Sequence, residues 1–100
     1  MTLSLRQRKR LPKLRDIAQI WHVLRLVVPM DEEPQHGWRE SYRGVINYRI
    51  KSETQGRSWM VDTYAGNYYV VTIGNRPPDM FKYIFSVVYY LRRMLNIQKL

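Results

Sequence analysis

Hydrophobic and polar residues alternate along the middle of this chain, between residues 42 and 73. A period of two is typical of β-strands, because successive side chains point to opposite faces of a sheet. The pattern predicts three consecutive strands, in the segments YRGVINYRIK, RSWMVDTY and YYVVTI, joined by the turns SETQG and AGN. In the first strand, apolar and aromatic residues alternate with Arg43, Arg49 and Lys51, which predicts one apolar and one cationic face.

Two segments that flank these strands have apolar residues at three- and four-residue steps, which is typical of helices. The first helix is expected over residues 13–28, between Pro12 and Pro29. The second is expected over residues 80–97, with Asp79 as its N-cap. Its buried face is predicted to hold Phe81, Ile84, Phe85, Val88, Leu91 and Leu95. The predicted fold class is α+β, with a three-stranded antiparallel sheet flanked by two helices in the order α-β-β-β-α.

The charge of the chain is strongly positive and unevenly distributed. Seventeen Lys and Arg residues against eight Asp and Glu give a net charge of +9. Six of the basic residues lie within residues 1–15, which contain no acidic residue. We therefore expect a basic, flexible N-terminal arm over residues 1–11 and a single α+β domain over residues 12–100. An excess of this size favours a polyanionic partner such as RNA, DNA or an anionic membrane surface.

The residues that catalysis or metal binding commonly needs are sparse. The absence of cysteine excludes disulfides, thiolate nucleophiles and cysteine-ligated zinc. The sequence contains no P-loop, nucleophile elbow or dinucleotide-binding fingerprint. His22 and His36 are its only histidines, and the acidic residues 31–33 lie in a proline-bounded loop rather than in a predicted pocket. We expect no enzymatic activity, no cofactor and no metal site.

The apolar runs of the sequence and its basic start bear on location. No apolar run reaches the roughly 18–20 residues that a membrane-spanning helix needs, and the basic start lacks the apolar core of a secretory signal. We expect an intracellular protein of the cytoplasm or nucleus, and the Arg-rich start leaves import into an organelle open. The basic run RQRKRLPKLR is typical both of contact with a polyanion and of nuclear import. The wide apolar surface of the first predicted helix would also allow a homodimer.

The main functional hypothesis is a small basic nucleic-acid-binding protein with RNA as its partner, such as a viral accessory protein or a ribonucleoprotein component. On an open sheet face, aromatic side chains can stack on bases while cations contact phosphates. The strand preference of Tyr and Trp explains the same aromatics without a ligand. The alternative hypothesis is a matrix-like or adaptor-like protein that binds another protein or an anionic membrane surface. The candidate nucleic-acid contacts are Arg6, Arg8, Lys9, Arg10, Lys13, Arg15, Arg43, Arg49, Lys51, Arg57, Arg76, Lys82 and Arg93.

The predicted α-β-β-β-α order with basic loops resembles double-stranded-RNA-binding domains, over about residues 12–95. In that family the first helix, the loop between the first two strands and the start of the last helix contact A-form RNA. In this sequence ETQGR stands in the place of the family's Gly-Pro-x-His loop, and RPPDMFK in the place of its lysine cluster. The resemblance implies RNA contacts for Arg15, Gln19, His22, Gly56, Arg57, Arg76 and Lys82.

Overall fold

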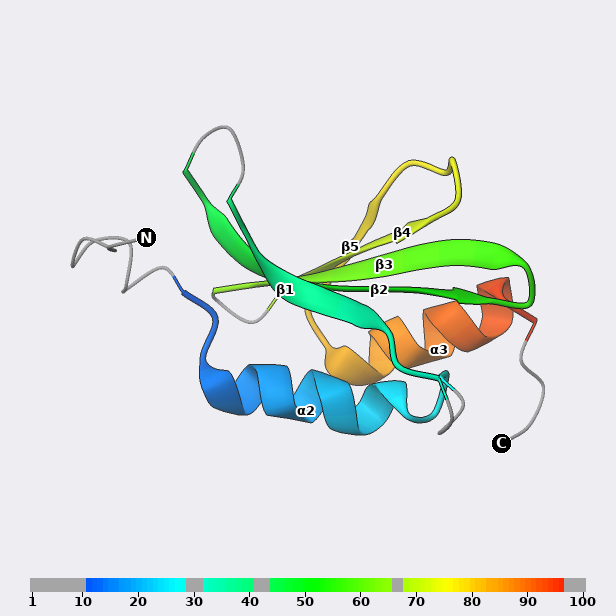
Figure 1. Ribbon diagram of the computed structural model, residues 1–100, viewed down its shortest axis with the longest axis horizontal. Helices are drawn as coiled ribbons and strands as arrows, with labels where there is room; N and C mark the ends of the chain where they lie inside the picture. Colours follow the sequence, from blue (N-terminus) through cyan, green and yellow to red (C-terminus); the bar gives the residue numbers. More distant parts are fainter. Residues whose placement is uncertain (1–10, 29–31, 41–43, 66–67, 97–100) are drawn as a thin grey trace.

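The computed structural model of the protein describes residues 11–28, 32–40, 44–65 and 68–96. Its elements are α2 (Leu14–Leu24), β1 (Gln35–Glu40), β2 (Ile46–Thr54), β3 (Arg57–Tyr64), β4 (Tyr68–Ile73), β5 (Asp79–Phe81) and α3 (Ile84–Met94). The five strands form one antiparallel sheet, in which the order in space is the order in the sequence. Both helices lie on the same face of this sheet (Figure 1). The α+β class and the two flanking helices are as predicted.

The core lies between the two helices and the face of the sheet that is turned toward them. Ile50 of β2 and Val61 of β3 are fully buried there, as the period of two predicts. Ile20 of α2 and both Val87 and Leu91 of α3 are also fully buried. The removal of this apolar surface from water is the main favourable contribution to the fold.

The sheet has five strands, so the prediction of three is wrong in number. β1 lies in a segment for which no strand was predicted, and nearly all of its side chains are exposed. Its backbone pairs with β2, from Gln35 opposite Lys51 to Glu40 opposite Ile46. β5 is only three residues long and pairs with β4. Both additional strands are edge strands, which bury few side chains and so lack the apolar alternation of a central strand.

The last helix begins later than the sequence predicts. Asp79, predicted as its N-cap, is the first residue of β5, and its carboxylate accepts a hydrogen bond from the Tyr90 hydroxyl at 2.6 Å. The helix starts at Ile84, and Tyr83 occupies the N-cap position without a side-chain hydrogen bond. Lys82 therefore lies in the link before the helix, rather than on its polar face.

Two apolar helix residues are exposed, and one of them, Phe85, was predicted to be buried. Leu14, the first residue of α2, is 77% exposed, and Phe85 of α3 is 66% exposed. The buried face of α3 passes through Ile84, Val88 and Leu91. Phe85 lies one residue beyond Ile84, about 100° further around the helix. An apolar residue next to the buried stripe is difficult to assign from spacing alone, because the stripe itself is about 100° wide.

Two further boundaries differ from the prediction, the end of β2 and the end of α2. The first predicted strand covered residues 42–51, whereas β2 continues to Thr54, and residues 42 and 43 lie outside the described residues. The turn that follows is a two-residue turn, in which Gln55 and Gly56 both have positive φ, at 55° and 74°. α2 ends at Leu24, and the turns after it still bury Val27 and Val28. Pro29, predicted to end this helix, lies outside the described residues.

Candidate nucleic-acid interface on the open face of the sheet

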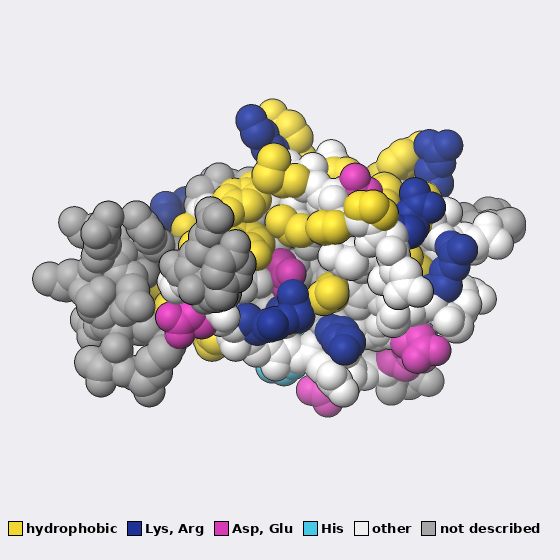
Figure 2. All heavy atoms as spheres, turned by 90° about the horizontal axis from the view of Figure 1, so that it is seen from above, with side chains coloured by type: hydrophobic (Ala, Val, Ile, Leu, Met, Phe, Trp, Pro, Cys, Tyr) yellow, Lys and Arg dark blue, Asp and Glu magenta, His cyan; other side chains and the backbone are white. Residues whose placement is uncertain are grey.

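One face of the sheet points away from the helices, and we call it the open face. Residues directly opposite each other in neighbouring strands share a face, so the strand register determines which residues lie there. Arg49 lies opposite Asp62, Lys51 opposite Met60, and Tyr64 opposite Tyr68. Figure 2 looks onto this face and shows Lys and Arg side chains beside a band of hydrophobic ones. Its residues include Arg39, Asn47, Arg49, Lys51, Glu53, Met60, Asp62, Tyr64, Tyr68, Val70, Thr72 and Met80.

Two tyrosines form a stacked pair on this face, and the outer side of the pair is a planar aromatic surface. The rings of Tyr64 and Tyr68 are stacked, with centroids 4.9 Å apart and an angle of 4° between their planes. They are cross-strand partners in β3 and β4, which brings the two rings together. Burial raises the pKa of the Tyr64 phenol, so its ring is uncharged at neutral pH. A planar, uncharged aromatic surface is suited to stacking on a nucleic-acid base.

A bidentate ion pair lies at the centre of the open face. Arg49 donates hydrogen bonds to the buried Asp62 from Nε at 2.6 Å and from a terminal nitrogen at 2.9 Å. This hydrogen bonding raises the pKa of Arg49, which therefore stays charged, but Asp62 compensates its charge. A guanidinium has five N–H donors, so three remain for another acceptor. This ion pair joins β2 to β3, and the compensated charge makes Arg49 a weaker candidate for a phosphate contact than the sequence implies.

Lys51 and Arg39 are the exposed cations of this face. Lys51, predicted as a contact, has no ion pair with an acidic side chain among the described residues. Arg39 was not predicted as a contact, because its segment lacks apolar alternation and no strand was predicted there. It lies opposite Asn47, whose buried Nδ2 has no hydrogen-bond partner. A buried amide without a hydrogen-bond partner is costly to stability.

The predicted contacts in the first helix lie on the other side of the molecule. Lys13 immediately precedes α2, and Arg15, Gln19 and His22 are exposed on the helix, in the layer beneath the sheet (Figure 1). Arg15 lies 3.9 Å from Asp16, and its side chain is 76% exposed. These residues therefore do not share a surface with the stacked tyrosines.

The remaining predicted contacts are scattered around the edges. Arg57 donates a hydrogen bond to the Met94 carbonyl at 2.6 Å, and so satisfies an acceptor at the C-terminal end of α3. Lys82 precedes the other end of α3, which is about 16 Å long. Arg76 lies in the connection between β4 and β5, and Arg93 lies on the exposed side of α3. The strand cations and the helix cations are thus on different faces of the molecule.

Five of the predicted contacts lie outside the described residues. They are Arg6, Arg8, Lys9, Arg10 and Arg43. The residues that the resemblance to double-stranded-RNA-binding domains implies as RNA contacts are all described, and their contact with RNA stays a prediction.

Neither histidine lies in a metal-binding cluster. His36 lies in β1 rather than in a loop, and a hydrogen bond of 2.5 Å joins its Nδ1 to the Tyr48 hydroxyl. Its ring also meets the edge of Trp21, with centroids 5.0 Å apart. Among the residues that the structure describes, no group of three or more His, Asp or Glu residues could hold a metal ion.

Comparisons with protein-family models, with curated proteins and with solved structures found no match for this chain. Within the described part of the chain, neither helix has the length and apolarity needed to cross a membrane. The function is therefore inferred from the surfaces of the molecule itself.

Proposed function

We propose that this protein binds single-stranded nucleic acid, RNA in particular, across the open face of its sheet. The observation that supports this is the stacked pair of Tyr64 and Tyr68 on the same face as Arg39 and Lys51. Single-strand-binding proteins combine aromatic rings, on which bases stack, with cations that contact the backbone between them. Five strands spaced by about 4.8 Å give a surface roughly 19 Å wide, which accommodates a few nucleotides.

A single strand fits this surface better than a duplex. Stacking on Tyr64 or Tyr68 needs an unpaired base, whereas the bases of an A-form duplex are stacked on each other. The cations on α2 that a duplex would contact, such as Arg15, lie on the opposite side from the two rings. RNA is favoured over DNA because sequence-specific RNA recognition mostly targets single-stranded segments of this kind.

The net charge of +9 supplies long-range attraction that the open face alone would not. Each phosphate that a cation neutralises releases a condensed counterion, so affinity is expected to fall as salt rises. The arm contributes to this attraction without contributing to base stacking. The contribution of the arm and that of the open face can therefore be measured separately.

The test measures the affinity of the full chain for a labelled oligouridine of about 12 nucleotides by fluorescence anisotropy. Loss of one stacking ring in Tyr68→Ala is expected to weaken binding by about tenfold, because stacking contributes ~1–3 kcal/mol per base. Tyr83→Ala is the matched control, since Tyr83 is 74% exposed and lies outside the open face. The control is expected to bind as the unmodified protein does.

Two further measurements distinguish the open face from the arm and a single strand from a duplex. Replacing Arg6, Arg8, Lys9 and Arg10 by Gln is expected to weaken binding and its salt dependence, while the effect of Tyr68→Ala persists. If Tyr68→Ala binds normally and only the arm variant fails, the open face is not the site. Tighter binding to duplex RNA than to the single strand would also contradict the proposal.

A further inference from the structure

The outer surface of α3 has a second group of exposed aromatic side chains. Phe85 is 66% exposed and Tyr89 is 70% exposed, and both point away from the core. Together with Arg93 they recur at every fourth residue and so form one line along the helix. We call this line the α3 ridge. A contiguous exposed apolar surface of this kind is typical of an interaction site.

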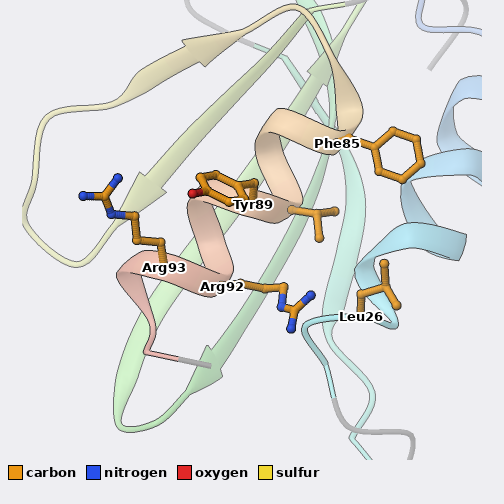
Figure 3. A pocket seen from close by; sticks show the side chains of 6 residues that line it. Leu26, Phe85, Tyr89, Arg92 and Arg93 are labelled. Atoms are coloured by element: carbon orange, nitrogen blue, oxygen red, sulfur yellow. The ribbon is translucent and has the colours of Figure 1, made fainter. Parts of the chain in front are cut away.

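A hollow lies on each side of the α3 ridge. The first, of about 530 Å³, lies between α3 and the turn that follows α2 (Figure 3). The second, of about 470 Å³, lies toward β5. The three ridge residues line both hollows. The first is completed by Leu26, Val88 and Arg92, and the second by Phe81, Ser86 and Tyr90.

This shape matches the way in which one helix packs against another. Residues four apart form a ridge on a helix, and such a ridge fits into the groove of a partner helix whose own ridges enter the flanking grooves. The α3 ridge has this spacing and has a hollow available on both sides. Its surface therefore fits a helical partner better than an extended one.

The charge of the same surface restricts the partner further. Arg92 and Arg93 lie in the last turn of α3, and Figure 3 shows their side chains extending to different sides of the helix. No Asp or Glu is among the described residues that line either hollow. A second copy of this chain would bring its own net charge of +9 to the interface.

We infer that the α3 ridge docks an amphipathic, acidic helix of a partner protein. The apolar face of that helix packs against Phe85 and Tyr89, and its carboxylates pair with Arg92 and Arg93. Apolar anchors flanked by complementary charge are a common way to bind a helix in a groove. This surface lies on the helix side of the sheet and is separate from the open face.

The test uses two synthetic helical peptides of about 16 residues, which is roughly four turns. They share one leucine-rich face and differ only in having Glu or Lys at the flanking positions. Fluorescence anisotropy of the labelled peptides with the full chain is expected to show at least ~10-fold tighter binding of the Glu peptide. The dissociation constant of the Glu peptide is expected to be about 0.1 mM or lower.

Variants of the protein locate the binding. Phe85→Ser and Tyr89→Ser are each expected to weaken binding of the Glu peptide by about tenfold. The double variant Arg92→Gln with Arg93→Gln is expected to weaken it by about fivefold and to strengthen binding of the Lys peptide, because two like charges are removed. Leu14→Ser is the matched control, because Leu14 is 77% exposed on the other helix. Circular dichroism of each variant confirms that it is folded.

Three outcomes overturn the inference. Equal affinity for the Glu and Lys peptides, or no binding of either at about 0.5 mM, removes the acidic helix as occupant. A dimer of the unmodified protein in sedimentation equilibrium that Phe85→Ser converts to a monomer identifies a second copy as the occupant. Weaker oligouridine binding by Phe85→Ser assigns the surface to nucleic acid. The peptide measurements do not depend on whether the open face binds RNA.

Discussion

The open face of the sheet and the α3 ridge both combine aromatic rings with arginine or lysine, but they arrange them differently. On the open face, the cations lie on β1 and β2 beside Tyr64 and Tyr68 of β3 and β4, and Asp62 lies between the two groups. On α3 the rings follow one line, and the two arginines lie at one end. Cations and rings side by side on a broad sheet suit a strand that presents phosphates to one side and bases to the other, whereas a line of rings with charge at one end suits an amphipathic helix. The two surfaces differ in the spatial order of their charges more than in their composition.

The largest expected effect comes from Asp62→Asn, which removes the carboxylate that pairs with Arg49 on the open face. Arg49 would lose its charged partner while three-quarters of its side chain stays buried, so we expect the free energy of unfolding to fall by about 2 kcal/mol. The same change adds one positive charge to the face, and affinity for oligouridine is expected to rise. Urea unfolding and anisotropy measure the two effects. An unchanged affinity would indicate that the nucleic acid does not approach this part of the sheet.

The second prediction compares paired charge removals on the two surfaces. Arg39→Gln with Lys51→Gln is expected to reduce the salt dependence of oligouridine binding by about 1.4 in log–log slope, or ~0.7 per lost phosphate contact. Arg92→Gln with Arg93→Gln removes the same charge from α3 and is expected to leave that slope nearly unchanged. Equal slopes for the two double variants would show that only net charge matters, and the distinction between the surfaces would fail.

The third prediction concerns the buried side of the sheet, which separates the two surfaces. The Oγ1 atom of Thr63 is buried and has no hydrogen-bond partner. Thr63→Val replaces this hydroxyl by a methyl group of similar volume, so we expect stability to rise by about 1 kcal/mol in urea unfolding. Binding at both surfaces is expected to stay the same. A loss of stability would show that the hydroxyl is satisfied in solution.

The smallest predicted effect is a loss of stability at alkaline pH, and it involves one tyrosine from each region. Burial raises the pKa of Tyr64 on the open face, and the hydrogen bond to Asp79 raises the pKa of Tyr90 beside the α3 ridge. Because the folded protein holds these protons more tightly than the unfolded chain, their contribution to stability is present below about pH 10 and is lost as the pH rises further. Unfolding measurements between about pH 8 and pH 11 test this.

Tyr64→Phe and Tyr90→Phe are each expected to reduce the loss of stability at alkaline pH, because each removes one of the two titrating phenols. Stability that is independent of pH over this range in the unmodified protein would contradict the prediction. A change confined to Tyr90→Phe would locate the effect beside α3 rather than on the open face.

The central strands and the two helices could be predicted from the sequence because their burial imposes a period. Ile50, Val61 and Val71 follow the alternation of a sheet with one covered face, and Ile84, Val88 and Leu91 follow the spacing of a helix. β1 and β5 could not be predicted in this way. They are edge strands held mainly by backbone pairing with β2 and β4, and backbone pairing leaves no apolar pattern.

The site was predictable only in part for a related reason. The alternation in the first strand does place Arg49 and Lys51 on one face, as the register shows. The ion pair between Arg49 and Asp62 depends on the register of two strands, which a single strand's pattern does not contain. Arg39 was missed because its strand was missed. The hydrogen bond of Arg57 to the end of α3 joins residues 37 positions apart, and no local signal marks it.

The consecutive order of the strands has a consequence for how the chain folds during synthesis. Each strand pairs with the one made just before it, so the sheet can grow as the chain emerges. Among the described elements, α3, which buries Trp59 and Val71 together with α2, is made after all five strands. Until α3 emerges from the ribosome, one apolar side of a nearly complete sheet stays exposed, and at that stage the nascent chain is most prone to aggregation. Burial of that apolar side therefore depends on α3.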